Sequence, residues 1–93
     1  MGIDIDLPQV RSLRKDVEDR FGCSLLTPRY FDRLSGELLD GREYLSPTTL
    51  MRVWKYKKSH QNRASVHTLN VLSRYAGYRD WPEFIDNYNA TRL

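Results

Sequence analysis

Apolar residues recur along the chain at the three- and four-residue spacing of amphipathic helices, and no segment reads convincingly as a strand. The first repeat predicts a helix over about residues 7–21. Its apolar positions are Val10, Leu13, Val17 and Phe21. Asp6 and Gln9 resemble a capping box at its start. Gly22 follows, where a helix commonly ends in a left-handed residue.

Two further helices are predicted to begin with a capping residue followed by proline, at Thr27-Pro28 and at Ser46-Pro47. The first of them reaches the turn at Asp40-Gly41 and buries Phe31, Leu34 and Leu38. The second is predicted over 46–57, with Leu50, Val53 and Trp54 on its inner side. Its outer side is expected to carry Thr48, Thr49, Met51, Arg52 and Lys55.

A polar stretch over 57–63 has no apolar period and is predicted to be a loop. A fourth helix is expected from about Ser65 to Gly77, with inward positions Val66, Leu69, Leu72 and Tyr75 or Ala76. A fifth begins at Asp80, where Asp80 and Glu83 have capping-box spacing. Its apolar positions are Trp81, Phe84, Ile85 and Tyr88. We expect the tail 89–93 to fray.

These elements predict an all-α fold, a compact bundle of about five short helices in a single domain over 1–93, with an ordered core over about 7–88. A chain of 93 residues is too short for two independent cores. No apolar run is long enough to span a bilayer, and the first residues lack the pattern of a secretory signal. The single cysteine, Cys23, favours a reducing, cytoplasmic location, and we expect it to be partly buried.

Charge is unevenly distributed along the chain although the formal net charge is only +3. Between Tyr44 and Arg79 there is no Asp or Glu, while the same segment holds seven Lys and Arg residues. The remaining residues include 8 basic and 12 acidic side chains, a net charge of −4. Such segregation predicts that the basic segment attracts a polyanion, and nucleic acid is favoured over a membrane surface because the apolar residues are needed for the core.

The helix predicted over 46–57 has the residue types that read a DNA groove. Short polar side chains at its first turn allow close approach, and a long donor one turn later can bond a guanine edge. We therefore expect Ser46, Thr48, Thr49 and Arg52 to face bases. The basic loop 55–63 is expected to follow the phosphates through Lys55, Lys57, Lys58 and Arg63.

The segment Leu45-Ser-Pro-Thr-Thr-Leu-Met-Arg52, followed by a basic turn and Ser65-Val-His-Thr-Leu-Asn-Val-Leu-Ser-Arg-Tyr-Ala-Gly77, resembles the helix-turn-helix domains of phage repressors of the lambda-repressor and Cro type. The resemblance covers roughly 34–78. It implies that helices two and three form the helix-turn-helix pair of a transcriptional regulator bound to double-stranded DNA, often as a homodimer. Gly77-Tyr78, Trp81 and Phe84 also resemble the ending of a domain found in small bacterial proteins.

The chain departs from that family at two places. The turn between helices two and three, residues 39–44, is longer than the usual four or so residues. Pro47 stands where the family often has a hydrogen-bond donor. The small residue that the family places on the inner face of helix two is Ser35 or Gly36 here.

Other functions find less support in the sequence. His60 and His67 have no neighbouring Cys or carboxylate, so we expect no metal or other cofactor. No phosphate-binding glycine loop or catalytic constellation occurs, which argues against an enzyme and a small-molecule substrate. The aromatic set near the C-terminus could stack single-stranded bases, but its helical spacing favours a core role. The alternative is a non-catalytic protein-interaction module with a repressor-like fold.

Overall fold

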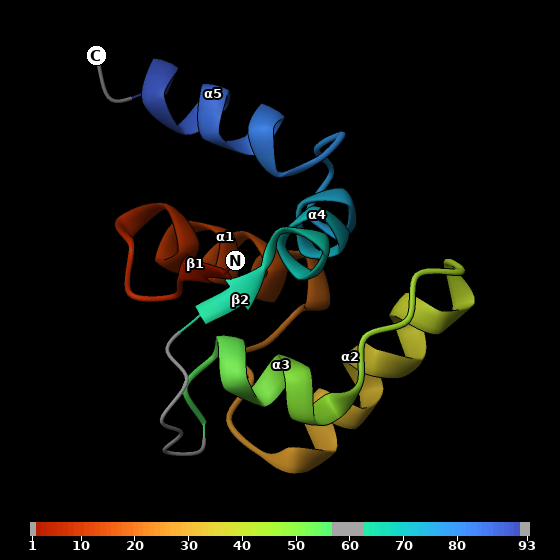
Figure 1. Ribbon diagram of the computed structural model, residues 1–93. Helices are drawn as coiled ribbons and strands as arrows, with labels where there is room; N and C mark the ends of the chain where they lie inside the picture. Colours follow the sequence, from red (N-terminus) through yellow and green to blue (C-terminus); the bar gives the residue numbers. More distant parts are fainter. Residues whose placement is uncertain (1, 57–62, 92–93) are drawn as a thin grey trace.

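The computed structural model describes residues 2–56 and 63–91, which contain five helices and two short strands (Figure 1). The elements follow the chain in the order β1 (Gly2–Asp4), α1 (Pro8–Phe21), α2 (Pro28–Asp40), α3 (Pro47–Val53), β2 (Arg63–Ser65), α4 (Val66–Tyr75) and α5 (Trp81–Thr91). The expected five helices are therefore confirmed. None of these helices is both long enough and apolar enough to cross a membrane.

The expectation of an entirely α-helical fold was wrong, because β1 and β2 form a two-stranded antiparallel sheet. In its register Gly2 lies opposite Ser65, and Asp4 lies opposite Arg63. Each strand is only three residues long, which is too short for an alternating pattern to be recognised in the sequence. The sheet attaches the N-terminal segment beside the start of α4.

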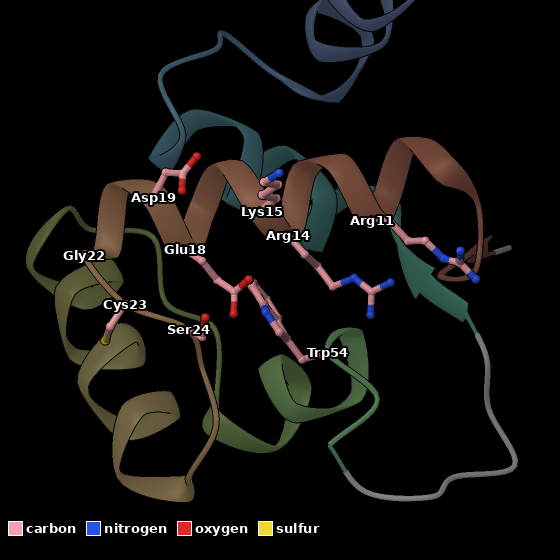
Figure 2. Close-up of a pocket in the computed structure, with 9 residues that line it drawn as sticks. All are labelled: Arg11, Arg14, Lys15, Glu18, Asp19, Gly22, Cys23, Ser24 and Trp54. Carbon is pink, nitrogen blue, oxygen red and sulfur yellow. The ribbon is translucent and has the colours of Figure 1, made fainter.

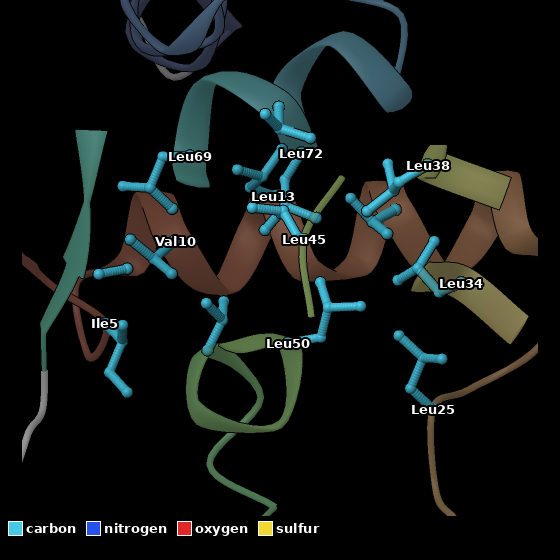
Figure 3. Close-up of a cluster of buried hydrophobic side chains, with 14 of the residues drawn as sticks. Ile5, Val10, Leu13, Leu25, Leu34, Leu38, Leu45, Leu50, Leu69 and Leu72 are labelled. Carbon is cyan, nitrogen blue, oxygen red and sulfur yellow. The ribbon is translucent and has the colours of Figure 1, made fainter. Parts of the chain in front are cut away.

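The hydrophobic core is built around α1 (Figure 3). Val10, Leu13 and Val17 of this helix are at most 1% exposed, as their spacing predicted. Leu50 of α3 and Leu72 of α4 approach from two sides and are fully buried. α5 packs on α4 and α1, so it lies across the molecule from α2 and α3 (Figure 1).

Several helix ends have the predicted local chemistry. Ser46 and Ser65 cap α3 and α4, each accepting a bond from the backbone N–H three residues later, at 3.2 and 3.1 Å. Asp80 accepts in the same way from the N–H of Glu83 at 2.9 Å. Gly22 ends α1 with a φ of +102°. Asp6 does not cap α1, because Leu7 occupies the capping position and makes no side-chain bond there.

The third helix differs most from its prediction over 46–57. It ends at Val53, since Trp54 closes the last turn and Lys55 adopts a left-handed φ of +56°. Met51, expected on the outer side, is buried at 9% exposure. A short helix between α2 and β2 has only a narrow free side, which explains why Met51 packs inward.

Three smaller expectations were also wrong. Val66, predicted to face inward, is 44% exposed at the first turn of α4. Cys23 lies exposed in the link between α1 and α2. The tail 89–93 was expected to fray, but α5 continues to Thr91, whose hydroxyl donates to the backbone carbonyl of Asn87; residues 92 and 93 lie outside the described part of the chain.

The link between α2 and α3 is held by hydrogen bonds from α2 and from α4. The buried Ser35 hydroxyl donates to the carbonyl of Leu45 at 2.6 Å. Glu43 accepts two-pronged hydrogen bonds from Arg74 of α4, the shortest at 2.7 Å. Ser35 therefore takes the inner-face position that the sequence left open, while Gly36 is exposed. These contacts fix the direction in which α3 leaves the link.

Candidate nucleic-acid interface

The four residues expected to face bases divide into two pairs. The hydroxyls of Ser46 and Thr49 bond to each other at 2.9 Å, and Ser46 also caps the helix. Both side chains are half-buried. Because their hydroxyls make these hydrogen bonds, they are engaged in fixing the first turn of α3. The other two, Thr48 and Arg52, lie one turn apart on the same side of α3.

Thr48 and Arg52 form the free side of α3. Thr48 is exposed and Arg52 is half-exposed. Among residues 2–56 and 63–91, no carboxylate forms an ion pair with Arg52. A guanidinium without an intramolecular partner keeps all of its donors for an external acceptor. This pair is the part of the predicted base-facing set that the fold leaves available.

Of the four residues expected to face phosphates, the structure describes two, and both contact other parts of the chain. The Nζ atom of Lys55 lies 2.7 Å from Oδ1 of Asp6. Arg63 belongs to β2 instead of the predicted loop, and its Nη1 donates to the backbone carbonyl of Gly2 at 3.5 Å. Lys57 and Lys58 lie outside the residues that the structure describes, as does His60. Lys55 and Arg63 therefore both lie beside the N-terminal segment.

The basic segment is partly neutralised by acids from elsewhere in the chain. Besides Lys55, Arg74 pairs with Glu43 at 2.7 Å, and Arg79 lies 4.0 Å from Glu83. The hydrogen bond from Arg74 to Glu43 raises the pKa of the Arg74 guanidinium. Arg74 and Arg79 are thus engaged with acids in the link before α3 and in α5, away from the free side of α3.

The sequence analysis missed a second group of cations, on α1. Arg11, Arg14 and Lys15 have the i, i+3, i+4 spacing that places them on one side of a helix. With Trp54 they line a pocket of about 600 Å³ (Figure 2). Their spacing was visible in the sequence, but α1 belongs to the acidic part of the chain, and only folding brings it against the end of α3.

Arg14 connects the two helices. Its Nη1 donates to the backbone carbonyl of Val53, the last residue of α3, at 3.3 Å. Burial, followed by repulsion from Arg11, lowers the pKa of Arg14 below its ordinary value, with partial compensation from Asp6 and Glu18. The guanidinium stays charged at neutral pH because its ordinary pKa is above 12.

Asp6 interacts electrostatically with two of these cations, Arg11 and Arg14. The hydrogen bond from Lys55 lowers the pKa of the Asp6 carboxyl, and the charges of Arg11 and Arg14 lower it further. At neutral pH one carboxylate thus faces three cations, from α1 and from the residues after α3. The surface around Asp6 is therefore positive overall.

The cations Arg11, Arg14 and Lys55 around Asp6 are suited to binding an anion. Among the described residues, no three His, Cys, Asp or Glu side chains are grouped as metal ligands. His67 is exposed at the start of α4. Comparisons with protein-family models, with curated proteins and with solved structures find no match to this chain.

Proposed function

We propose that this chain is a duplex-DNA-binding domain of a cytoplasmic transcriptional regulator, which presents the free side of α3 to the major groove. Thr48 and Arg52 carry the proposal, because they lie one turn apart on a helix whose opposite side is packed in the core. An arginine at such a position can bond both acceptors of a guanine edge. Ser46 and Thr49 contribute by fixing the first turn.

Phosphate contacts would come from the cations on either side of α3. Lys55 follows the helix directly, and Arg63 begins the strand beside it. Neutralising phosphates releases counterions from DNA, so affinity for duplex should fall steeply with salt. A homodimer would place two such helices on successive half-sites of the operator.

A duplex titration tests the proposal directly. Fluorescence anisotropy with a labelled random-sequence duplex should show binding at about 50 mM salt that weakens by orders of magnitude at about 200 mM. A pool of sequences should then yield a preferred site. Arg52→Ala should reduce affinity for that site by about tenfold, since a bidentate base contact is worth about 1–3 kcal/mol.

Arg29→Ala is the matched control, because Arg29 is an exposed arginine at the start of α2 and lies outside the proposed interface. It should leave the affinity within about twofold. Absence of duplex binding at about 50 mM salt would overturn the proposal, as would equal losses from the two arginine variants.

A protein-interaction module is the second candidate, and one observation favours it. Leu39 and Tyr44 are 57% and 55% exposed at the end of α2 and in the link to α3. Exposed apolar side chains of this size often mark a contact with another protein. If Leu39→Ser abolishes capture of a partner while duplex binding is absent, this second function is the correct one.

A further inference from the structure

The pocket between α1 and the end of α3 is shown in Figure 2, and neither Thr48 nor Arg52 lines it. Arg11, Arg14 and Lys15 line it from α1, and Trp54 lines it from the residue that closes α3. Its volume of about 600 Å³ lies within the range of small-ligand sites. The pocket therefore combines a concave shape with a cluster of positive charge.

The cations of the pocket make no close ion pair with the acids that the structure describes. Among the described residues, none of Arg11, Arg14 and Lys15 forms an ion pair, whereas Lys55, Arg74 and Arg79 all do. Burial lowers the pKa of Arg14, and repulsion from Arg11 lowers it further. An anion placed between them would remove that repulsion.

Two acids line the pocket as well, and they reduce its positive charge without reversing it. Glu18 and Asp19 line the pocket together with the three cations, so its charged side chains sum to one net positive charge. The Oε2 atom of Glu18 accepts a hydrogen bond from the N–H of Leu25 at 2.7 Å, and this holds the link after α1 in place. The end of the pocket at Arg11 and Arg14 is therefore the end that favours an anion.

Buried donors without acceptors lie at the same place. Three buried side-chain polar atoms among the described residues lack a hydrogen-bond partner, and two of them are Arg14 Nε and Trp54 Nε1. Both residues line the pocket. A buried N–H without an acceptor is uncommon in folded proteins and calls for a bound partner.

We propose that this pocket binds a phosphate group, held by the guanidinium groups of Arg11 and Arg14 with the indole N–H of Trp54 as an additional donor. The planar fork of an arginine matches two phosphate oxygens, and phosphate carries enough acceptors for several N–H groups at once. Both N–H groups are buried in the structure, so phosphate binding requires the side chains of Arg14 and Trp54 to turn them toward the ligand. The phosphate could belong to a DNA backbone or to a small phosphate ester.

Nuclear magnetic resonance of the ¹⁵N-labelled chain tests the proposal with inorganic phosphate as the probe. Ionic strength is held constant with sodium chloride. The indole N–H signal of Trp54 and the Nε–H signal of Arg14 should shift and saturate as phosphate is added. The indole signal of Trp81, which is buried at the start of α5, serves as the internal reference and should not move.

Variants decide whether the shifts come from the pocket. Arg14→Gln should weaken phosphate binding at least fivefold, and Arg29→Gln should leave it unchanged. Trp54→Phe keeps an aromatic ring and removes the N–H, so it should weaken binding about twofold to fivefold. The proposal is overturned if no saturable shift occurs, or if Arg14→Gln and Trp54→Phe both bind phosphate like the original chain.

Two further titrations identify the source of the phosphate. A duplex that shifts the Trp54 signal, and whose affinity falls in Arg14→Gln, indicates a backbone phosphate in the pocket. A nucleoside monophosphate that shifts this signal when duplex does not indicates a small ester. Arg52→Ala should weaken duplex binding without changing the affinity for inorganic phosphate, so failure of the DNA-binding proposal can be told apart from failure of this one.

Discussion

The Nζ atom of Lys55 lies 2.7 Å from Oδ1 of Asp6, although 49 positions of sequence separate the two residues. Asp6 precedes α1, and Lys55 follows α3 by one residue beyond its closing Trp54. The pair joins the acidic and basic parts of the chain. Lys55 belongs to the proposed DNA interface, so under that proposal Asp6 would compete with phosphate for it.

Replacing Asp6 by Asn should strengthen duplex binding. The change frees Lys55 and removes the carboxylate that faces Arg11 and Arg14. Release of a cation to a phosphate increases the salt dependence of binding. We expect affinity at about 50 mM salt to rise severalfold, and the slope of log affinity against log salt to steepen by about one, measured by anisotropy.

The matched control for Asp6→Asn is Asp86→Asn, which changes net charge equally on the exposed side of α5. It should raise affinity much less, since Asp86 lies on a different helix from the proposed interface. Equal gains in the two variants would mean that only net charge matters. The unfolding midpoint of Asp6→Asn should change little, because exposed ion pairs contribute little to stability.

The hydrogen bond between Ser35 and Leu45 sets the start of α3, and its removal should be costly. In Ser35→Ala the carbonyl of Leu45 loses a buried donor at 2.6 Å. A buried acceptor left without a partner costs about 1–3 kcal/mol. Urea unfolding should show a loss of that size in the free energy of unfolding.

Ser24→Ala provides the comparison for Ser35→Ala, since Ser24 is exposed in the link after α1. It should change the free energy of unfolding by less than about 0.5 kcal/mol. A Ser35→Ala variant as stable as Ser24→Ala would show that the link does not depend on this bond.

The sequence predicted the helices well because their signals are local. The spacing of Val10, Leu13 and Val17 gave the buried side of α1, and serine followed by proline gave the start of α3. Capping and apolar period depend only on neighbours within one or two turns. Such features can be recognised without knowing which helices pack together.

The features that were missed depend on contacts between distant segments. Pairing of Gly2 with Ser65 requires the two strands to be brought together by the whole fold. α3 ends at Val53, where Lys55 turns to a left-handed φ and the Val53 carbonyl accepts a hydrogen bond from Arg14 of α1, and the apolar pattern of one helix does not reveal this. Net charge counted along segments of the sequence did not reveal the cations of α1. A binding surface combines residues that are distant in the sequence and become neighbours only in the folded chain.

The pairing of β1 with β2 should depend on the absence of a side chain at Gly2. A Cβ atom there would lie 2.6 Å from the Cβ of Arg63, which belongs to the backbone-proximal part of that side chain and has little room to move. Overpacking of this kind typically costs about 1–3 kcal/mol. Gly2→Ala should therefore separate the strands, detected as faster hydrogen exchange at the amides of residues 2–4 and 63–65.

Gly36→Ala is the contrasting glycine variant. Gly36 lies on the exposed side of α2, and a Cβ atom there meets nothing within 4 Å. Alanine favours a helix over glycine by about 1 kcal/mol, so this variant should be more stable than the original chain. If both glycine variants are stabilised, the tight contact between Gly2 and Arg63 does not exist in solution.

Stability should fall in strongly alkaline solution because of Tyr75. Its hydroxyl donates to Oε1 of Glu37 at 2.9 Å. Burial, followed by the interaction with Glu37, raises the pKa of Tyr75 to about 12. The ordinary value is about 10, so the unfolded chain loses this proton first. The stabilising contribution is complete below about pH 10 and is lost as the pH rises toward 12.

Urea unfolding at pH 7, 10 and 11.5 measures this effect. Two pKa units correspond to at most about 2.7 kcal/mol, and solvent screening of the half-buried Tyr75 reduces the expected loss to about 1 kcal/mol. Tyr75→Phe should lose stability at pH 7 and show a shallower decline above pH 10. Tyr44→Phe, which removes an exposed phenol, should follow the original chain. Identical alkaline slopes in Tyr75→Phe and Tyr44→Phe would refute the assignment to the Tyr75–Glu37 contact.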